Sequence, residues 1–210
     1  MATHNGMRVR RLPTLRSKHL ETVVHTLLST IHAMSSDFDI VHYHCLGPAL
    51  FSFLPRLAGK KTVVTVQGLD WQRKKWGWMA TRILRWGEAA AVSLPSATMV
   101  VSRTLQQHYR NVHSSETIYV PNGATSAALR PPRQLLEWDL APECYVLFLG
   151  RFSPEKNCQL LIDAFEHLRA AEGLPLGMKL VLAGGSSHSD SYVSALRQHE
   201  SEQIHFLPWV

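Results

Sequence analysis

The sequence has few cysteines, no long apolar run and no repeats. Its 210 residues include only three cysteines, and no two of them have the C-x-x-C spacing of metal and redox sites. No apolar run approaches the ~18 residues that a membrane-spanning helix needs. The sequence also has no internal repeat and no low-complexity tract. We therefore expect a globular protein of the reducing cytoplasm rather than a disulfide-stapled, membrane-spanning or repeat protein.

Charge is also sparse, and it is not concentrated in one place. Charged residues make up 18% of the chain, and 22 Lys and Arg against 16 Asp and Glu give a net charge of +6. A nucleic-acid-binding protein more often has one dense basic stripe or a recognisable reading module. We therefore expect no nucleic-acid partner. Phosphate-bearing ligands and an anionic membrane surface remain compatible with this charge.

Short apolar, β-branched segments alternate with segments of helical periodicity along the chain. Such alternation predicts parallel β-α-β crossovers, and strands without polar alternation predict sheets that are covered on both faces. The expected strands are 39–44, 62–66, 98–101, 117–120, 145–149, 179–182 and 204–206, with a weak one at 7–12. The expected helices are 18–34 with Ser17 as N-cap, 50–57 after a break at Gly47-Pro48, about 78–91, 103–109, 160–168 and 192–199.

A segment rich in proline divides the chain. Residues 124–142 contain three prolines and have little apolar periodicity. We interpret this segment as a linker between a first lobe, residues 1–123, and a second lobe, residues 143–210. The predicted fold class is α/β, with two doubly wound, Rossmann-like lobes that are both incomplete. In such sheets ligands bind beyond the carboxyl ends of the strands, so the residues that follow each strand are the informative ones.

Two cations follow the expected strand 145–149. Gly150 permits a sharp turn there, and Arg151 and Lys156 then flank the start of the next helix. A helix N-terminus attracts anions, and Arg can bind phosphate with two hydrogen bonds while Lys supplies a point charge. This pattern suits a diphosphate. Two solvated surface cations beside a turn would give the same pattern.

Polar residues also follow two strands of the first lobe. His42 and His44 lie on one face of strand 39–44, where His44 contacts a ligand or both are core histidines. A His-x-His metal site lacks a third ligand nearby in sequence, so no metal is expected. Gln67 and Gly68 follow strand 62–66 as site or turn residues. Asp70 either binds an acceptor hydroxyl or caps the local turn.

Tryptophans and basic residues are interleaved just beyond Asp70. Trp71, Trp76 and Trp78 alternate with the basic run 73–75. Such a mixture can lie at a membrane interface, stack on a sugar ring, or pack a long loop onto the lobe. Peripheral contact with the inner face of the membrane is therefore an expectation for this segment.

Several of these segments resemble one enzyme family. The run 150–157, followed by 160–165, resembles the opening of the donor lobe in group 1 glycosyltransferases, also called family 4, which are retaining enzymes of the GT-B fold. The strand 39–44 resembles the family's strand ending in histidines. The segments 120–123 and 182–185 resemble its inter-lobe turn and its next glycine loop. The four motifs occur in the family's order and cover residues 36 to 210.

The resemblance implies roles for residues on the donor side. In the family, the matching Arg and Lys hold the donor diphosphate and stabilise charge on the leaving group, which makes Arg151 and Lys156 the donor clamp. Gly150, Gly184 and Gly185 become donor-binding residues. The cation pair supplies the charge that a metal would otherwise supply, so no metal and no other cofactor is implied.

The resemblance also implies an acceptor side. Many members carry a histidine where this chain has Gln67, beside the reacting sugar. Glutamine cannot titrate, so Gln67 would orient the donor sugar or acceptor rather than move a proton. His44, Gly68 and Asp70 would lie on the acceptor side.

The implied reaction moves a sugar from a nucleoside-diphosphate donor to a glycan or a lipid-linked acceptor, with retention. The alternatives are a non-catalytic nucleotide- or anion-binding remnant and a sugar-nucleotide epimerase of the same fold. The family's opening strand and glycine-rich loop are not found before Leu20, and its E-x7-E motif is not found before Val210. We therefore expect the isolated chain to be a fragment that self-associates and does not turn over.

Overall fold

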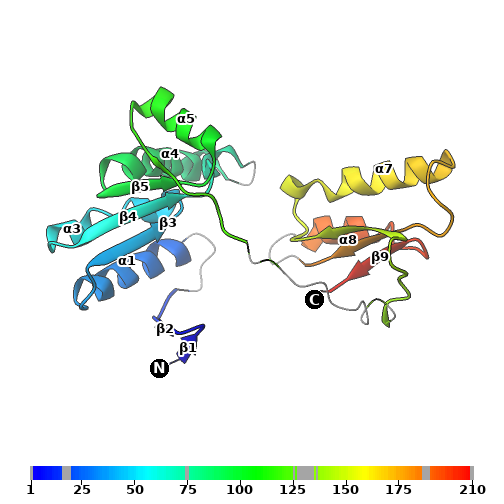
Figure 1. The fold of residues 1–210 in the computed structure, drawn as a ribbon, viewed down its shortest axis with the longest axis horizontal. Helices are drawn as coiled ribbons and strands as arrows, with labels where there is room; N and C mark the ends of the chain where they lie inside the picture. Colours follow the sequence, from blue (N-terminus) through cyan, green and yellow to red (C-terminus); the bar gives the residue numbers. More distant parts are fainter. Residues whose placement is uncertain are drawn as a thin grey trace. The chain divides into compact units, whose positions relative to one another are not determined.

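The computed structural model describes residues 2–15, 20–73, 76–124, 126, 135, 137–185 and 190–208. The chain divides into two units, Met1–Thr125 and Ser126–Val210 (Figure 1). Each unit contains its own parallel sheet, whose strands are joined through helices. The α/β fold class predicted from the alternation of strands and helices is confirmed in both.

The first unit contains a four-stranded parallel sheet and a separate two-stranded hairpin. The sheet has the order β3-β4-β5-β6, and residues at the carboxyl ends of β3 and β4 lie opposite one another, His44 beside Thr65. In chain order the elements are β1 (Ala2–His4), β2 (Met7–Val9), α1 (Glu21–Met34), β3 (Ile40–His44), α2 (Leu46–Ala49), α3 (Leu54–Leu57), β4 (Lys61–Val66), the 3₁₀ turn η1 (Asp70–Gln72), α4 (Trp78–Ser93), β5 (Ala97–Val100), α5 (Arg103–His113) and β6 (Ile118–Tyr119).

The core of the first unit lies between the sheet and its crossover helices. Gly87 of α4 meets the backbone of α2 so closely that an added Cβ would overlap the carbonyl oxygen of Leu46 and lie 2.8 Å from its carbon. A side chain there would hold the two helices apart. The buried cluster consists of Tyr43, Leu46, Ala49, Val64, Val66, Ala91, Val100, Leu105 and Tyr109.

One predicted element of this unit was wrong, and a second is confirmed only in part. Instead of one helix at 50–57, two short helices form, and α2 includes Gly47 and Pro48, which were expected only to separate strand 39–44 from that helix. Proline is compatible with the first turn of a helix, because the N–H group that it lacks has no partner there. The weak strand predicted at 7–12 is confirmed over Met7–Val9, where β2 pairs with the unpredicted β1 as an antiparallel hairpin.

The start of the first helix also differs from the prediction. Helix α1 begins at Glu21 with Leu20 as its N-cap, and no side chain caps it. The predicted cap, Ser17, lies outside the described residues.

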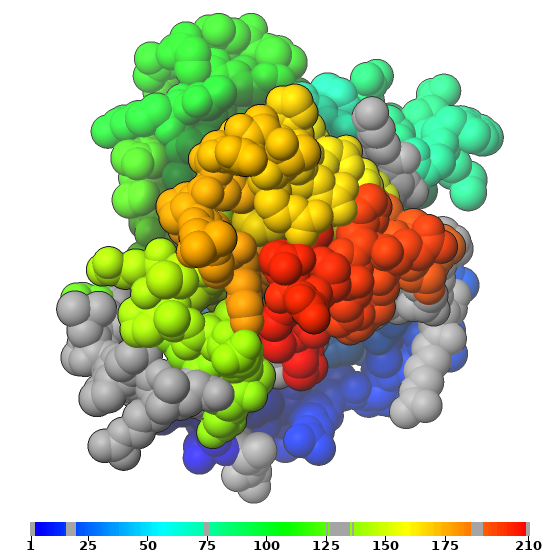
Figure 2. Space-filling model, turned by 90° about the vertical axis from the view of Figure 1, so that its right-hand side faces the viewer, coloured from blue at the N-terminus to red at the C-terminus, as the bar shows by residue number. Residues whose placement is uncertain are grey.

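The second unit contains a three-stranded parallel sheet of order β7-β8-β9. Its elements are β7 (Tyr145–Leu149), the 3₁₀ turn η2 (Pro154–Lys156), α7 (Cys158–Ala170), β8 (Lys179–Ala183), α8 (Asp190–Arg197) and β9 (Ile204–Leu207). Helices α7 and α8 lie side by side in Figure 2 (yellow and orange-red). His199, just after α8, pairs with Glu166 of α7 at 3.0 Å. The buried cluster consists of Phe152, Cys158, Ile162, Phe165, Leu180, Leu182, Leu196, Ile204 and Phe206.

Strand β7 is more exposed than its apolar sequence predicted. Among the described residues it pairs with β8 alone, and its side chains at Leu147 and Leu149 are 51% and 61% exposed. The continuous apolar pattern predicted a strand covered on both faces. In the part of the chain that the structure describes, no helix is both long and apolar enough to cross a bilayer.

Candidate functional site

The two glycine segments of the second unit lie directly against each other. Gly150 donates its N–H to the carbonyl of Ala183 at 3.0 Å, and Phe152 donates to the carbonyl of Gly185 at 3.0 Å. Gly184 has a φ of +148°, and a Cβ there would overlap the Gly150 carbonyl oxygen and lie 2.9 Å from its carbon. Gly150, Gly184 and Gly185 are therefore brought together at the carboxyl ends of β7 and β8, with Gly184 buried and Gly150 and Gly185 partly exposed.

A buried phenylalanine holds the predicted clamp segment in place. Phe152 is 1% exposed, and its ring lies 6.2 Å from that of Phe148 and 5.8 Å from that of Phe206. Arg151, just before it, is exposed, and Lys156 is exposed at the end of η2. Within the described residues, neither of these two cations makes a hydrogen bond or ion pair. Both are therefore available to an anionic ligand.

The same segment leads into the N-terminus of a long helix. Asn157 adopts a left-handed φ of +54°, and α7 then runs for 13 residues from Cys158. The first N–H groups of a helix have no partner within it, and the helix dipole adds positive potential at this end. Arg151, Lys156 and the start of α7 together form a cationic edge of a kind that binds phosphate.

The two histidines of β3 are held on one side of the strand. The Nε2 atom of His42 lies 2.7 Å from Oγ1 of Thr65 on β4, and the rings of His42 and His44 are 4.4 Å apart. Burial lowers the pKa of His42, and the neighbouring His44 lowers it further. His42 therefore has a hydrogen-bond partner in the sheet, and His44 lies at the strand end. Both residues are exposed, so neither is a core histidine.

Gln67 is paired with a residue far along the chain. It follows β4 directly, and its Oε1 atom accepts a hydrogen bond from Nδ2 of Asn122 at 3.0 Å. Asn122 belongs to the segment 120–123 that follows β6. The sequence drew attention to both segments separately and gave no sign of this contact. Gly68, next to Gln67, has open space around its Cα.

Asp70 does not cap the local turn with its side chain, and its expected contact with an acceptor hydroxyl stays a prediction. It opens η1, where no side chain makes a capping hydrogen bond, and its Oδ1 atom lies 3.3 Å from an Arg73 nitrogen. Burial raises the pKa of the Cys45 thiol, and the charge of Asp70 adds to that rise. Asp70 is therefore a charge-paired residue close to the end of β3.

Trp71 packs the loop after β4 onto the first unit. It is half-buried against the core, and the guanidinium of Arg85 lies 4.7 Å from its ring centroid. Its Nε1–H donates to Oε2 of Glu88 at 2.6 Å. Trp78, by contrast, is 77% exposed. The packing interpretation therefore fits Trp71 and does not fit Trp78.

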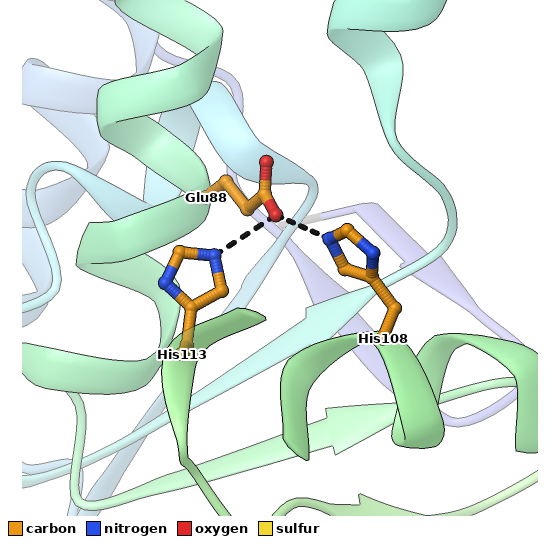
Figure 3. Close-up of side chains that lie close together, drawn as sticks. All are labelled: Glu88, His108 and His113. Atoms are coloured by element: carbon orange, nitrogen blue, oxygen red, sulfur yellow. Dashed lines mark hydrogen bonds and ion pairs between the residues drawn. The ribbon is translucent and has the colours of Figure 1, made fainter. Parts of the chain in front are cut away.

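Sequence reasoning missed a cluster of two histidines and a glutamate. Glu88 of α4 lies between His108 and His113 of α5 (Figure 3). The Nε2 atoms of the two histidines are 2.6 Å and 2.9 Å from Oε1 of Glu88. The available signal was the pair of histidines five positions apart at the end of a helix, but nothing in the sequence indicated that Glu88 would face them.

A hollow in the second unit lies away from the glycine segments. It has a volume of about 440 Å³ and is lined by Asp139, Leu140, Ala141, Pro142, Cys144, Gly177 and Lys179. These residues lie at the amino ends of β7 and β8, and Lys179 is already paired with Asp139 at 2.7 Å. Ligands of parallel sheets bind at the opposite, carboxyl ends, so we do not assign the donor to this hollow.

Solved structures share this fold at low sequence identity. HepE of Anabaena, crystallised with UDP and glucose, matches at 17% identity and a TM-score of 0.69 over 91% of this chain and 53% of its own. Its complex with UDP matches at 16% identity and a TM-score of 0.65 over 94% of this chain and 55% of its own. TarM, solved from S. aureus, matches at 12% identity and a TM-score of 0.62, over 90% of this chain and 36% of its own.

The low identities and partial coverage limit what these structural matches show. The chain spans about half the length of HepE. At identities this low, the structural likeness shows the fold alone. The GT-B architecture implied by the motifs is confirmed. Among curated proteins, none matches the sequence.

Family models cover nearly the whole chain. Residues 1–123 match the model described as a glycosyl transferase 4-like domain. Residues 140–210 match the model described as glycosyl transferases group 1. Over half of the chain lies within the first match alone, so the chain belongs to the group 1 glycosyltransferases.

Proposed function

We propose that the protein containing this chain transfers a sugar from a nucleoside-diphosphate donor to a glycan or a lipid-linked acceptor, with retention of the anomeric configuration. One observation carries the proposal. Arg151 and Lys156 are exposed, have no hydrogen-bond or ion-pair partner among the described residues, and lie in the segment that joins Gly150 to the start of α7. Support also comes from HepE, which was crystallised with UDP and with UDP and glucose.

The cationic edge acts on the leaving group. As the glycosidic bond breaks, the nucleoside diphosphate gains negative charge, and cations already in place stabilise that charge more than they stabilise the bound substrate. Arg151 would bind phosphate oxygens through two N–H groups, and Lys156 would supply a second charge. The missing side chains at Gly150 and Gly185 would let the diphosphate approach the N–H groups at the start of α7, and Gly184 would allow the close backbone packing beneath them.

The acceptor side would lie at the ends of β3 and β4. Gln67 would orient the reacting sugar or acceptor through its amide, and its bond to Asn122 fixes the side chain for that role. The exposed ring of His44 is the nearest candidate for contact with an acceptor hydroxyl. Gly68 leaves room for the acceptor beside Gln67, and Asp70 would act through its ion pair with Arg73.

A lipid-linked acceptor would explain an exposed apolar stripe on α4. Trp78, Met79 and Trp86 are 77%, 62% and 61% exposed, and Ile83 and Arg82 are exposed between them. Aromatic and basic side chains on one helix suit the interface of an anionic bilayer. We expect the chain to sediment with vesicles containing phosphatidylglycerol, and Trp78→Ser with Trp86→Ser to release it.

The decisive experiment is a turnover assay on the intact protein. A panel of nucleoside-diphosphate sugars is incubated with glycan and lipid-linked acceptors, and nucleotide release is measured. One donor should be consumed in an acceptor-dependent manner, and the anomeric proton signal of the product should match that of the donor. Inversion would refute the retaining mechanism. Donor binding without turnover would favour a non-catalytic remnant, and isomerisation of the donor sugar would favour an epimerase.

A further inference from the structure

The Glu88–His108–His113 cluster has the composition of a metal centre. The three ligand atoms, Oε1 of Glu88 and Nε2 of each histidine, all lie within 4.8 Å of one another (Figure 3). Two imidazoles and one carboxylate form a ligand set that zinc takes in proteins. Calcium and magnesium prefer oxygen ligands alone, so this mixed set disfavours them.

The cluster is buried on the glutamate side and borders solvent on the histidine side. Glu88 is buried, with 6% of its side chain exposed, whereas the side chains of His108 and His113 are 24% and 20% exposed. The glutamate is thus fixed inside, and the histidines border solvent. An ion could enter from that side, and a water molecule could complete a tetrahedral set.

Trp71, outside the three-residue cluster, fixes the second carboxylate oxygen of Glu88. Trp71 donates its Nε1–H to Oε2 of Glu88 at 2.6 Å, which leaves Oε1 facing the histidines. Outer contacts of this kind hold metal-binding side chains in position.

The spacing of the ligand atoms is close to what zinc requires. Tetrahedral zinc with bonds of ~2.0–2.1 Å places its ligand atoms ~3.3 Å apart. The two N–O separations are 2.6 Å and 2.9 Å, so each must widen by about 0.4 to 0.7 Å. Partly exposed histidine side chains can make such a shift by small rotations.

We propose that Glu88, His108 and His113 bind one zinc ion, with water as the fourth ligand. The ion ties α4 to α5, and through Trp71 it also braces η1, the turn that begins at Asp70, three residues after Gln67. This role is one of structural support and does not depend on the proposed transfer reaction. Metal binding and sugar transfer can therefore fail independently.

The test is zinc binding by the full 210-residue chain. Metal-free protein is titrated with zinc chloride in competition with a chromophoric chelator, and cobalt(II) replaces zinc in a second titration. We expect one zinc per chain and intense visible cobalt bands of tetrahedral coordination. His108→Gln with His113→Gln should weaken zinc binding by about 100-fold or more and abolish those bands, and Trp71→Phe should weaken it by about 10-fold.

Matched variants separate the site from other histidines and from misfolding. His25→Gln with His205→Gln removes two histidines elsewhere and should leave zinc affinity unchanged. Glu88→Gln keeps the shape of the side chain and weakens zinc binding, with circular dichroism reporting whether each variant folds. Sub-stoichiometric zinc in the wild-type chain, or unchanged affinity in the folded His108→Gln, His113→Gln variant, would overturn the proposal. The three residues would then form only a hydrogen-bonded cluster.

Discussion

Replacing Gly184 by alanine should damage the second unit more than its single methyl group suggests. The φ of +148° is unfavourable for any residue with a Cβ, at a cost of about 1–3 kcal/mol. The new Cβ would also overlap the Gly150 carbonyl oxygen, and displacing the packed backbone adds about 1–3 kcal/mol. We therefore expect the free energy of unfolding to fall by about 3–5 kcal/mol, a large part of the stability of a domain this size.

The assay combines urea unfolding with hydrogen exchange of peptides that cover β7 and β8, so that the loss is assigned to the second unit. Gly177→Ala is the matched control, because Gly177 also has a positive φ, +80°, but no atom lies within 4 Å of an added Cβ. It should cost only the backbone strain, about 1–2 kcal/mol. Equal losses for the two variants would refute the close contact between the glycine segments.

Three further predictions concern the first unit. Gly87→Ala should lower the free energy of unfolding of the first unit, measured by urea unfolding, by about 1–3 kcal/mol, because the new Cβ would meet the Leu46 backbone. Gly77→Ala, at a position with open space, should not lower it. The lowered pKa of His42 means that the unfolded chain binds more protons than the folded chain just below pH 6.5, so the free energy of unfolding rises with pH in that window. When urea unfolding is measured across that window, His42→Gln should flatten this rise. An unchanged slope would contradict the assignment to His42. Gln67→His should retain part of the transferase activity, and a kinetically silent Gln67→Ala would place this residue outside the site.

Local pattern was enough to predict most strands and the turn at Gly150. The alternation of apolar segments with helical periodicity is a property of neighbouring residues, so β4, β5, α5 and α7 follow from it. The two helices α2 and α3 could not be predicted in this way. Each has only four residues, too few to show helical periodicity, and each contains a proline in its first turn.

Contacts between distant residues could not be predicted from pattern. The backbone contact between Gly150 and Gly184 and the bond between Gln67 and Asn122 depend on which strand ends are neighbours in the folded sheet. The Glu88 cluster likewise requires α4 and α5 to pack with one particular rotation. The exposure of β7 depends on what covers the sheet, which its apolar sequence does not specify.

The most direct test of the central claim is the kinetic effect of the two cations in the intact protein. Arg151→Ala and Lys156→Ala should each lower kcat/KM for the sugar donor by about 100-fold or more, because one charge-stabilising group contributes ~3 kcal/mol to the transition state. Arg169→Ala removes the same charge from the far end of α7, where Arg169 bonds to Gln203, and should leave kcat/KM within about twofold. Wild-type kcat/KM in both Arg151→Ala and Lys156→Ala would contradict the assignment of the donor clamp.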